Sequence, residues 1–265
     1  FNMSSLSEFQ LWVPSKADVY TQNGQPVYEI IGTDSQIVQF PLGPGQSINC
    51  TSGAMAYMSS TVKMSAAYKS GGGFQGTMAR IAGGGSLLNT NYKNESYEEN
   101  GYVSMTPDYP GVIFPVDMKQ CPSGKIIAMR DSYLCSVVNP IDASHSYVGA
   151  GFNPSETVGA VCCGGLDLIV QTVSGGELAF LMGMGTIISK TLSEGESILI
   201  DTDSILCFEA SVQVDVKTVG GFAAICCAGD GLFNTQLTGP GKIWLQSLSI
   251  DKMRKLFVPP PQKEK

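Results

Sequence analysis

The chain has 265 residues and a formal net charge of −7, with only 15% charged residues and 31 glycines. The acidic balance argues against nucleic acid as a partner, because a surface that binds nucleic acid needs basic residues to neutralise phosphates. No run reaches the roughly 20 apolar residues of a membrane span, and the length allows a sizeable core. The composition indicates one turn-rich domain whose low charge fits either surfaces made for protein contacts or a large β core.

Short alternating runs near the N-terminus predict strands at residues 9–13, 27–31 and 35–40. A turn at residues 41–45 opens the part of the chain that repeats. Residues 89–101 are polar and acidic and lack a period, which predicts a loop or an insertion.

A strand, an acidic turn and a second strand recur along the chain. Residues 195–208, GESILIDTDSILCF, match residues 124–135, GKIIAMRDSYLC, and residues 44–57 are a divergent first copy. The leading glycines, Gly45, Gly124 and Gly195, are too far apart for a solenoid repeat. This spacing favours three supersecondary units within one domain.

A second repeated pattern follows each of these copies. Apolar runs at residues 232–237 and 243–245 flank Gly239-Pro240-Gly241, which predicts a hairpin. Runs around glycine turns at residues 83–85 and 174–176 have the same order. We therefore predict an all-β single domain of three pseudo-equivalent β units, prism-like and pseudo-threefold, with little helix.

The end of the chain differs from the rest. Residues 250–257 have helical spacing with Ser249 as N-cap, and three prolines then predict an extended tail. The predicted organisation is N-terminal strands and an arm over residues 1–39, the three-unit β domain over 40–248, and a short helix with a proline-rich tail over 249–265.

The eight cysteines show no close disulfide-type spacing, which indicates a reducing compartment. Cys162-Cys163 and Cys226-Cys227 lie in apolar runs, so we expect free thiols in or beside the core. The chain has no CxxC pattern, and we expect no metal.

No catalytic or cofactor site assembles from the pattern. His145 is the only histidine and lies in a polar loop without a nucleophile-elbow sequence. The glycine clusters are not followed by a helix that carries a lysine, so turns explain them better than phosphate binding does. Asp131, Asp203 and Asp230 suit turn capping. We expect a protein that is not an enzyme and holds no cofactor.

The final repeat, GDGLFNTQLTGPGKIWLQS at residues 229–247, with Pro110-Gly111 ahead of the second unit, resembles the altered-inheritance-of-mitochondria (mitochondrial biogenesis) family. The resemblance covers roughly residues 40–247. It implies a β fold related to the tryptophan RNA-binding attenuator protein, with three units and self-association. It brings no catalytic residues, and the charge opposes RNA binding.

The leading hypothesis is a structural protein that assembles with itself into rings or sheets. Phe1 at the start of the chain is similar to the processed termini of diatom stromal proteins, so a protein shell around the Rubisco-containing pyrenoid is expected, with Rubisco or pyrenoid components as partners and the chloroplast stroma as location. The alternatives are mitochondrial inner-membrane organisation, a small-molecule-binding β module, and a mitochondrial or cytoplasmic location. The residues expected to make the assembly contacts are Phe1, Phe9, Trp12, Leu256, Phe257, Val258, Pro259, Pro260, Pro261, Lys263 and Lys265.

Overall fold

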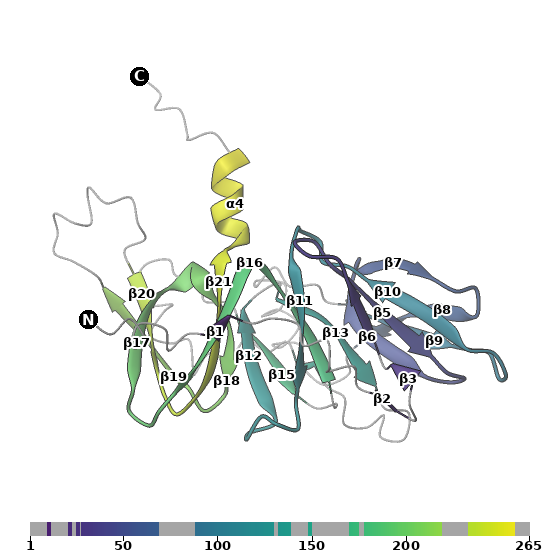
Figure 1. The fold of residues 1–265 in the computed structure, drawn as a ribbon, viewed down its shortest axis with the longest axis horizontal. Helices are drawn as coiled ribbons and strands as arrows, with labels where there is room; N and C mark the ends of the chain where they lie inside the picture. The colour runs from purple at the N-terminus through teal and green to yellow at the C-terminus, as the bar shows by residue number, and fades with distance from the viewer. Residues whose placement is uncertain are drawn as a thin grey trace.

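Figure 1 shows a computed structural model of the chain. It describes residues 10–11, 21–22, 25–26, 28–68, 88–129, 132–138, 148–149, 170–174, 178–218 and 233–257. The regular elements of these residues are strands, apart from one 3-10 turn, η2 at Thr202–Ser204, and one short helix, α4 at Ile250–Phe257. The expected all-β domain with little helix is confirmed.

The strands after the N-terminal segment form three sets of six, which we call strand sets 1, 2 and 3. Set 1 comprises β5 Ile37–Leu42, β6 Ser47–Thr51, β7 Met55–Met58, β8 Val62–Tyr68, β9 Leu88–Asn94 and β10 Gly101–Met105. Set 2 comprises β11 Val112–Asp117, β12 Lys125–Met129, β13 Tyr133–Val138, β14 Val148–Gly149, β15 Val170–Ser174 and the first half of β16 Leu178–Leu192. Set 3 comprises the second half of β16, β17 Ser197–Asp201, β18 Ile205–Glu209, β19 Gln213–Thr218, β20 Phe233–Thr238 and β21 Gly241–Leu248.

Each set has the same antiparallel pairings. The sixth strand pairs with the first and the third: β10 with β5 and β7, β16 with β11 and β13, β21 with β16 and β18. The fifth strand pairs with the second and the fourth: β9 with β6 and β8, β15 with β12 and β14, β20 with β17 and β19. The register of each third strand shifts at one point, which is a β-bulge. The prism and its threefold axis stay a prediction.

The sets are joined in two ways. β16 is one strand of 15 residues that ends set 2 and begins set 3. In addition, β6 pairs with β13 and β12 pairs with β18, so the second strand of one set lies beside the third strand of the next. These ladders connect most strands into a twelve-stranded sheet, and the sets follow one another along the long axis of the molecule (Figure 1).

Three clusters of buried apolar side chains hold the sheets together. The first lies between sets 1 and 2 and contains Phe40, which meets Phe180 of β16 edge to face with ring centroids 4.8 Å apart. The second lies between sets 2 and 3 and contains Phe114 and Trp244. The third lies in set 3 around Phe208. Because Phe180 belongs to set 2, the first core is closed by a strand of the next set.

The repeated strand, turn and strand pattern is confirmed in its described parts. Gly45, Gly124 and Gly195 have φ of 74°, 59° and 75°, a backbone region that favours glycine. The second strand of a set begins within two residues of each glycine. The periodic glycines therefore mark equivalent turns.

The predicted hairpin at Gly239-Pro240-Gly241 is wrong, although the turn itself is present. β20 pairs with β17 and β19, whereas β21 pairs with β16 and β18, so the turn carries the chain from one sheet to another. The Gly239 N–H donates to the Glu196 carbonyl at 2.9 Å, and a Cβ on Gly239 would collide with the Ser193 carbonyl oxygen. The glycine allows two turns to pack together, and turn residues alone do not distinguish such a corner from a hairpin. The hairpin predicted around residues 174–176 is wrong for the same reason, because β15 pairs with β12 and β14, whereas β16 pairs with β11 and β13. The turn predicted at residues 83–85 lies outside the described residues.

The loop predicted at residues 89–101 is wrong over its first half, because β9 occupies that part. This strand lies between β6 and β8, and its polar residues find partners there. The Asn91 amide donates to the Asn49 side-chain oxygen at 2.7 Å. Neighbouring strands thus provide hydrogen-bond partners for the polar side chains of β9, and the strand forms without alternating apolar residues.

The N-terminal segment contributes four short strands. β1 Gln10–Leu11 pairs with β16, β2 Thr21–Gln22 pairs with β3 Gln25–Pro26, and β4 Glu29–Ile31 pairs with β5. Tyr28 packs edge to face on Phe180, with ring centroids 4.9 Å apart. The three predicted segments of the chain, 1–39, 40–248 and 249–265, stay a prediction.

Candidate assembly surfaces

The expected assembly residues are divided by what the structure describes. Leu256 and Phe257 form the end of α4, and the Phe257 side chain is 76% exposed. The others lie outside the described residues: Phe1, Phe9, Trp12, Val258, Pro259, Pro260, Pro261, Lys263 and Lys265. Phe257 is thus the predicted contact residue that the structure places at the surface.

The start of α4 is fixed by its cap. The Ser249 side-chain oxygen accepts a hydrogen bond from the Lys252 backbone N–H at 3.2 Å, and the Ser249 carbonyl accepts from Met253 at 2.9 Å. This is the N-cap arrangement that the sequence predicts, and it is confirmed. Because β21 ends at Leu248, the cap makes the helix leave the sheet directly.

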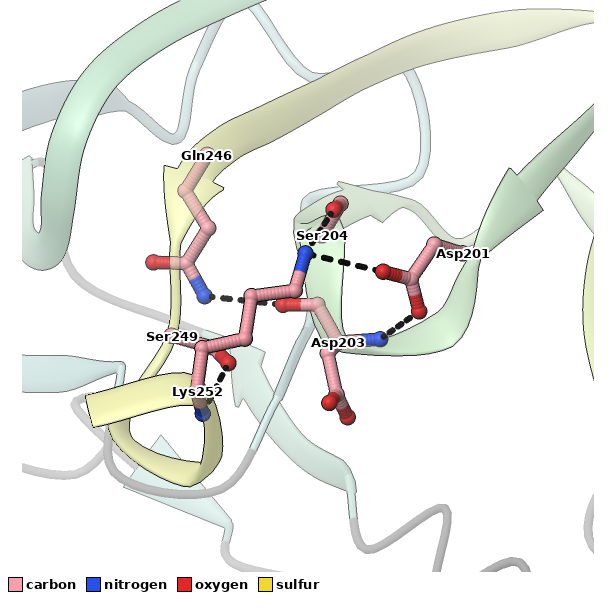
Figure 2. Close-up of polar contacts among 6 residues, drawn as sticks. All are labelled: Asp201, Asp203, Ser204, Gln246, Ser249 and Lys252. Carbon is pink, nitrogen blue, oxygen red and sulfur yellow. Dashed lines mark hydrogen bonds and ion pairs between the residues drawn. The ribbon is translucent and has the colours of Figure 1, made fainter. Parts of the chain in front are cut away.

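The side chain of Lys252 ties α4 to η2 (Figure 2). Its Nζ lies 2.8 Å from an Asp201 carboxylate oxygen and 3.1 Å from Ser204 Oγ. Beside it, the Gln246 amide of β21 donates to the Asp203 carbonyl at 3.4 Å. The helix therefore has a defined position relative to set 3, and so has the exposed Phe257 at its end.

The acidic turn predicted at Asp203 is capped by the carboxylate of Asp201. The Asp201 carboxylate accepts a hydrogen bond from the Asp203 backbone N–H at 3.2 Å, which caps η2. Asp131 and Asp230 lie outside the described residues. The sequence indicated the right turn, but the carboxylate at its first position makes the bond.

An apolar surface that the sequence did not single out lies at β7. Tyr57 and Met58 are 41% and 36% exposed. The Tyr57 hydroxyl donates to the Gln39 side chain at 2.8 Å, and its ring lies 6.2 Å from that of Tyr102. We call residues 55–58 the β7 edge. The run MAYM, apolar at every position, is the signal that could have found it.

A second exposed apolar residue lies at the opposite end of the molecule, on β17 (Figure 1). Leu199 is 49% exposed, whereas its neighbour Ile200 is buried in the third core cluster. We call residues 197–201 the β17 edge. The alternation in ESILID predicts a strand with one buried face, but it does not say whether another strand lies alongside.

The described thiols are free and buried: Cys50, Cys121, Cys135 and Cys207. Burial raises the pKa of Cys50 from 9.0 to about 12. Burial, aided by the nearby Glu209 and Asp117 carboxylates, raises the pKa of Cys121 to about 11. Protonated thiols are poor nucleophiles and poor metal ligands. The pairs Cys162-Cys163 and Cys226-Cys227 lie outside the described residues, so that prediction stays open.

The described part of the chain contains no group of three or more His, Cys, Asp or Glu side chains that could hold a metal ion. His145 and the glycine clusters at residues 71–73, 83–85 and 164–165 lie outside it. No helix in the described ranges is long and apolar enough to cross a membrane.

Fold and surface together define an all-β protein of one domain, built from recurring strand pairings, with apolar residues exposed at both ends. The chain belongs to the mitochondrial biogenesis AIM24 family, whose model matches residues 28–248. The match covers all three strand sets and ends at the last residue of β21.

Two individual proteins are similar to this chain. An uncharacterised protein of Streptococcus pyogenes serotype M6 is 23% identical over 222 residues, which is 82% of this chain and 83% of that protein. The crystal structure of a Streptococcus pyogenes protein has a TM-score of 0.61 at 19% identity, with 87% of this chain and 97% of that chain covered. The second likeness shows the fold alone.

Proposed function

We propose that this protein is a non-enzymatic structural protein that assembles with copies of itself. The observation that carries the proposal is Phe257, a large apolar side chain 76% exposed at the end of a helix held by a cap and an ion pair. A rigidly presented aromatic residue loses little conformational entropy when it docks, and such residues are typical anchors of protein interfaces. The sequence of residues 258–261, VPPP, predicts an extended segment after this anchor.

We also propose that the three strand sets are pseudo-equivalent units. The recurrence of both pairings and of the bulge in each third strand supports this. Strand edges already join the sets within one chain, and equivalent edges would join copies in the same way.

The setting of the assembly has two candidates. Membership of a family described as mitochondrial biogenesis supports a role in organising mitochondrial membranes. The second candidate is the pyrenoid shell around Rubisco, in the chloroplast stroma. Imaging of the tagged protein in cells against mitochondrial and plastid markers decides between them.

The experiment compares the full chain with a chain that ends at Leu256. We expect light scattering and negative-stain imaging to show concentration-dependent arrays for the full chain, and arrays that are lost or weakened for the truncated one, with unchanged circular dichroism. The point variant Phe257→Ser separates the anchor from the rest of the tail. A full chain that stays monomeric at every concentration would overturn the proposed function. Equal arrays from both chains would show that the tail takes no part.

A further inference from the structure

Two junctions inside the molecule are built in the same way. At the first, β6 of set 1 pairs antiparallel with β13 of set 2, with Cys50 opposite Cys135. At the second, β12 of set 2 pairs antiparallel with β18 of set 3, with Ala128 opposite Cys207. Each junction joins the second strand of one set to the third strand of the next. The chain therefore contains two examples of one edge-to-edge contact.

One third strand and one second strand, at the two ends of the molecule, take part in neither junction. Among the described residues, β7, the third strand of set 1, pairs with β10 alone. β17, the second strand of set 3, likewise pairs with β20 alone. The two strands lie at opposite ends of the molecule (Figure 1), so they do not meet within one copy. An unpaired strand edge is a template for another strand.

The side chains at these two edges are exposed where their counterparts in a junction are buried. Leu199 of β17 is 49% exposed and Met58 of β7 is 36% exposed. Their counterparts at the second junction, Ile127 and Phe208, are 7% and 3% exposed. The two end strands thus carry apolar side chains at positions that the internal contact covers.

The two edges lack the lysine and the proline that protect many strand edges. Natural edges are guarded by lysine, proline, inward-pointing charge, short strands or β-bulges, and the β7 edge, MAYM, has no lysine, proline or charge. Its bulge does not prevent pairing, because β13 and β18 carry the same bulge and each pairs with a second strand at a junction. The charged residue of the β17 edge is Asp201, whose carboxylate already binds Lys252 of α4. Neither edge therefore repels another strand.

The register of the third strands can be aligned by their bulges. In β7, β13 and β18 the first residue pairs with the sixth strand, and the register then shifts by one residue. Tyr57 therefore occupies in β7 the place that Cys135 occupies in β13 and Cys207 occupies in β18. These last two residues are the ones that face a second strand across the junctions.

The second strands can be aligned by the turn that follows them. Three residues separate the second strand from the third in every set. Ile200 of β17 therefore occupies the place of Cys50 in β6 and of Ala128 in β12. Both counterparts lie opposite the residue that follows the bulge of the next set.

We propose that copies of this chain join head to tail, with β17 of one copy pairing antiparallel with β7 of the next. The internal register places Ile200 opposite Tyr57 and Leu199 opposite Met58. The contact is heterologous, because two different edges meet, and such contacts extend into open arrays unless a ring closes. The inference rests on the proposed self-assembly and names the strands that carry it.

Charge variants in the full chain test this pairing. We expect Met58→Lys and Leu199→Lys each to raise the concentration needed for assembly by at least about tenfold, because a lysine opposite an apolar residue removes the cross-strand contact. The double variant Met58→Glu with Leu199→Lys restores assembly through opposite charges across the junction. Met64→Lys is the matched control, since Met64 is 61% exposed on β8 and leaves assembly unchanged. Sedimentation velocity and negative-stain imaging measure the arrays, and circular dichroism checks the fold.

Mixing the two single variants tests the head-to-tail geometry. Met58→Lys retains its β17 edge and Leu199→Lys retains its β7 edge. An equimolar mixture therefore forms dimers of one copy of each variant, and no assembly larger than a dimer. A contact between two identical edges would give no such complementation.

A crosslinking variant keeps the test open if the charged variants fail to fold. Met58→Cys with Leu199→Cys in one chain forms a ladder of disulfide-linked oligomers under mild oxidation, whereas either single variant stops at dimers. If the charge variants assemble as the wild-type chain does and the double-cysteine variant forms no ladder, the β7–β17 contact is overturned. The proposed self-assembly then still stands. If the wild-type chain forms no arrays and the double-cysteine variant forms no ladder, both proposals are overturned.

Discussion

Cys50 shows how burial alters the chemistry of a single residue. Its Sγ lies 3.6 Å from the Thr90 carbonyl oxygen and donates a hydrogen bond to it. Burial raises its pKa from 9.0 to about 12. The thiol of the unfolded chain ionises near 9.0, whereas the folded one stays protonated until about 12. Unfolding therefore becomes more favourable as the pH rises through this window, and the stability present below pH 9 is lost.

The variant Cys50→Ser should weaken this pH dependence. The serine hydroxyl can keep the hydrogen bond to Thr90, and it does not titrate in this range. We expect the free energy of unfolding to fall less steeply above pH 9, by about 1.4 kcal/mol per pH unit for one thiol. Urea unfolding at several pH values between 7.5 and 11 measures the slope. Cys121→Ser is the graded comparison, because the pKa of Cys121 is raised only to about 11. Equal slopes for wild type and Cys50→Ser would contradict this account.

At the scale of elements, α4 depends on two contacts of different kinds. The Ser249 cap lies in a buried position, whereas the Lys252 and Asp201 side chains are partly open to solvent. A buried cap is insensitive to salt, and an exposed ion pair is screened by it. The position of the helix therefore rests mainly on the cap.

The variant Ser249→Ala should loosen α4 more than Asp201→Asn does. Loss of an N-cap costs about 1 kcal/mol, which corresponds to about fivefold faster amide exchange in residues 250–257. Asp201→Asn removes the ion pair and should have a smaller effect that disappears in high salt. Hydrogen exchange followed by mass spectrometry measures both, with the peptides of β21 as the internal reference. Exchange in residues 250–257 that is accelerated as much by Asp201→Asn as by Ser249→Ala would contradict this assignment.

Local patterns predicted α4 and many of the strands, but not how the strands pair. Ser249, the helical spacing after it and the turn glycines act over a few residues, so the sequence displays them. β9 was missed because its polar side chains are satisfied by β6 and β8, which lie far away in the chain. The turn at Gly239 was found but assigned to a hairpin, since the partner of β20 is set by β17. The β7 and β17 edges were missed for the same reason: whether a strand has a neighbour is a property of the whole sheet.

At the scale of the whole molecule, the strand sets are bound into one folding unit. β16 serves sets 2 and 3, and the first core cluster contains Phe180 of set 2 together with Phe40 of set 1. Loss of one set therefore exposes apolar surface of its neighbour. Unfolding should be one cooperative transition.

Asn94 offers a way to weaken set 1 alone. Its side chain is fully buried, donates to the Leu42 and Glu99 carbonyls at 2.9 and 2.8 Å, and accepts from the Ser96 N–H at 3.1 Å. Asn94→Ala removes two buried hydrogen bonds to these carbonyls and the acceptor of the Ser96 N–H, which costs about 2–4 kcal/mol.

Trp244 reports the consequence from a distance, because it lies in the second core cluster between sets 2 and 3. With Trp12 replaced by Phe, it is the remaining tryptophan of the two in the chain. We expect Asn94→Ala to lower the urea midpoint seen by Trp244 fluorescence and the midpoint seen by circular dichroism by the same amount. The exposed neighbour Asn100, changed to Ala, should leave both midpoints in place. If Asn94→Ala shifts part of the dichroism signal while Trp244 unfolds at its original midpoint, set 1 unfolds on its own. The coupling through β16 and Phe180 would then be too weak to make the three strand sets one cooperative unit.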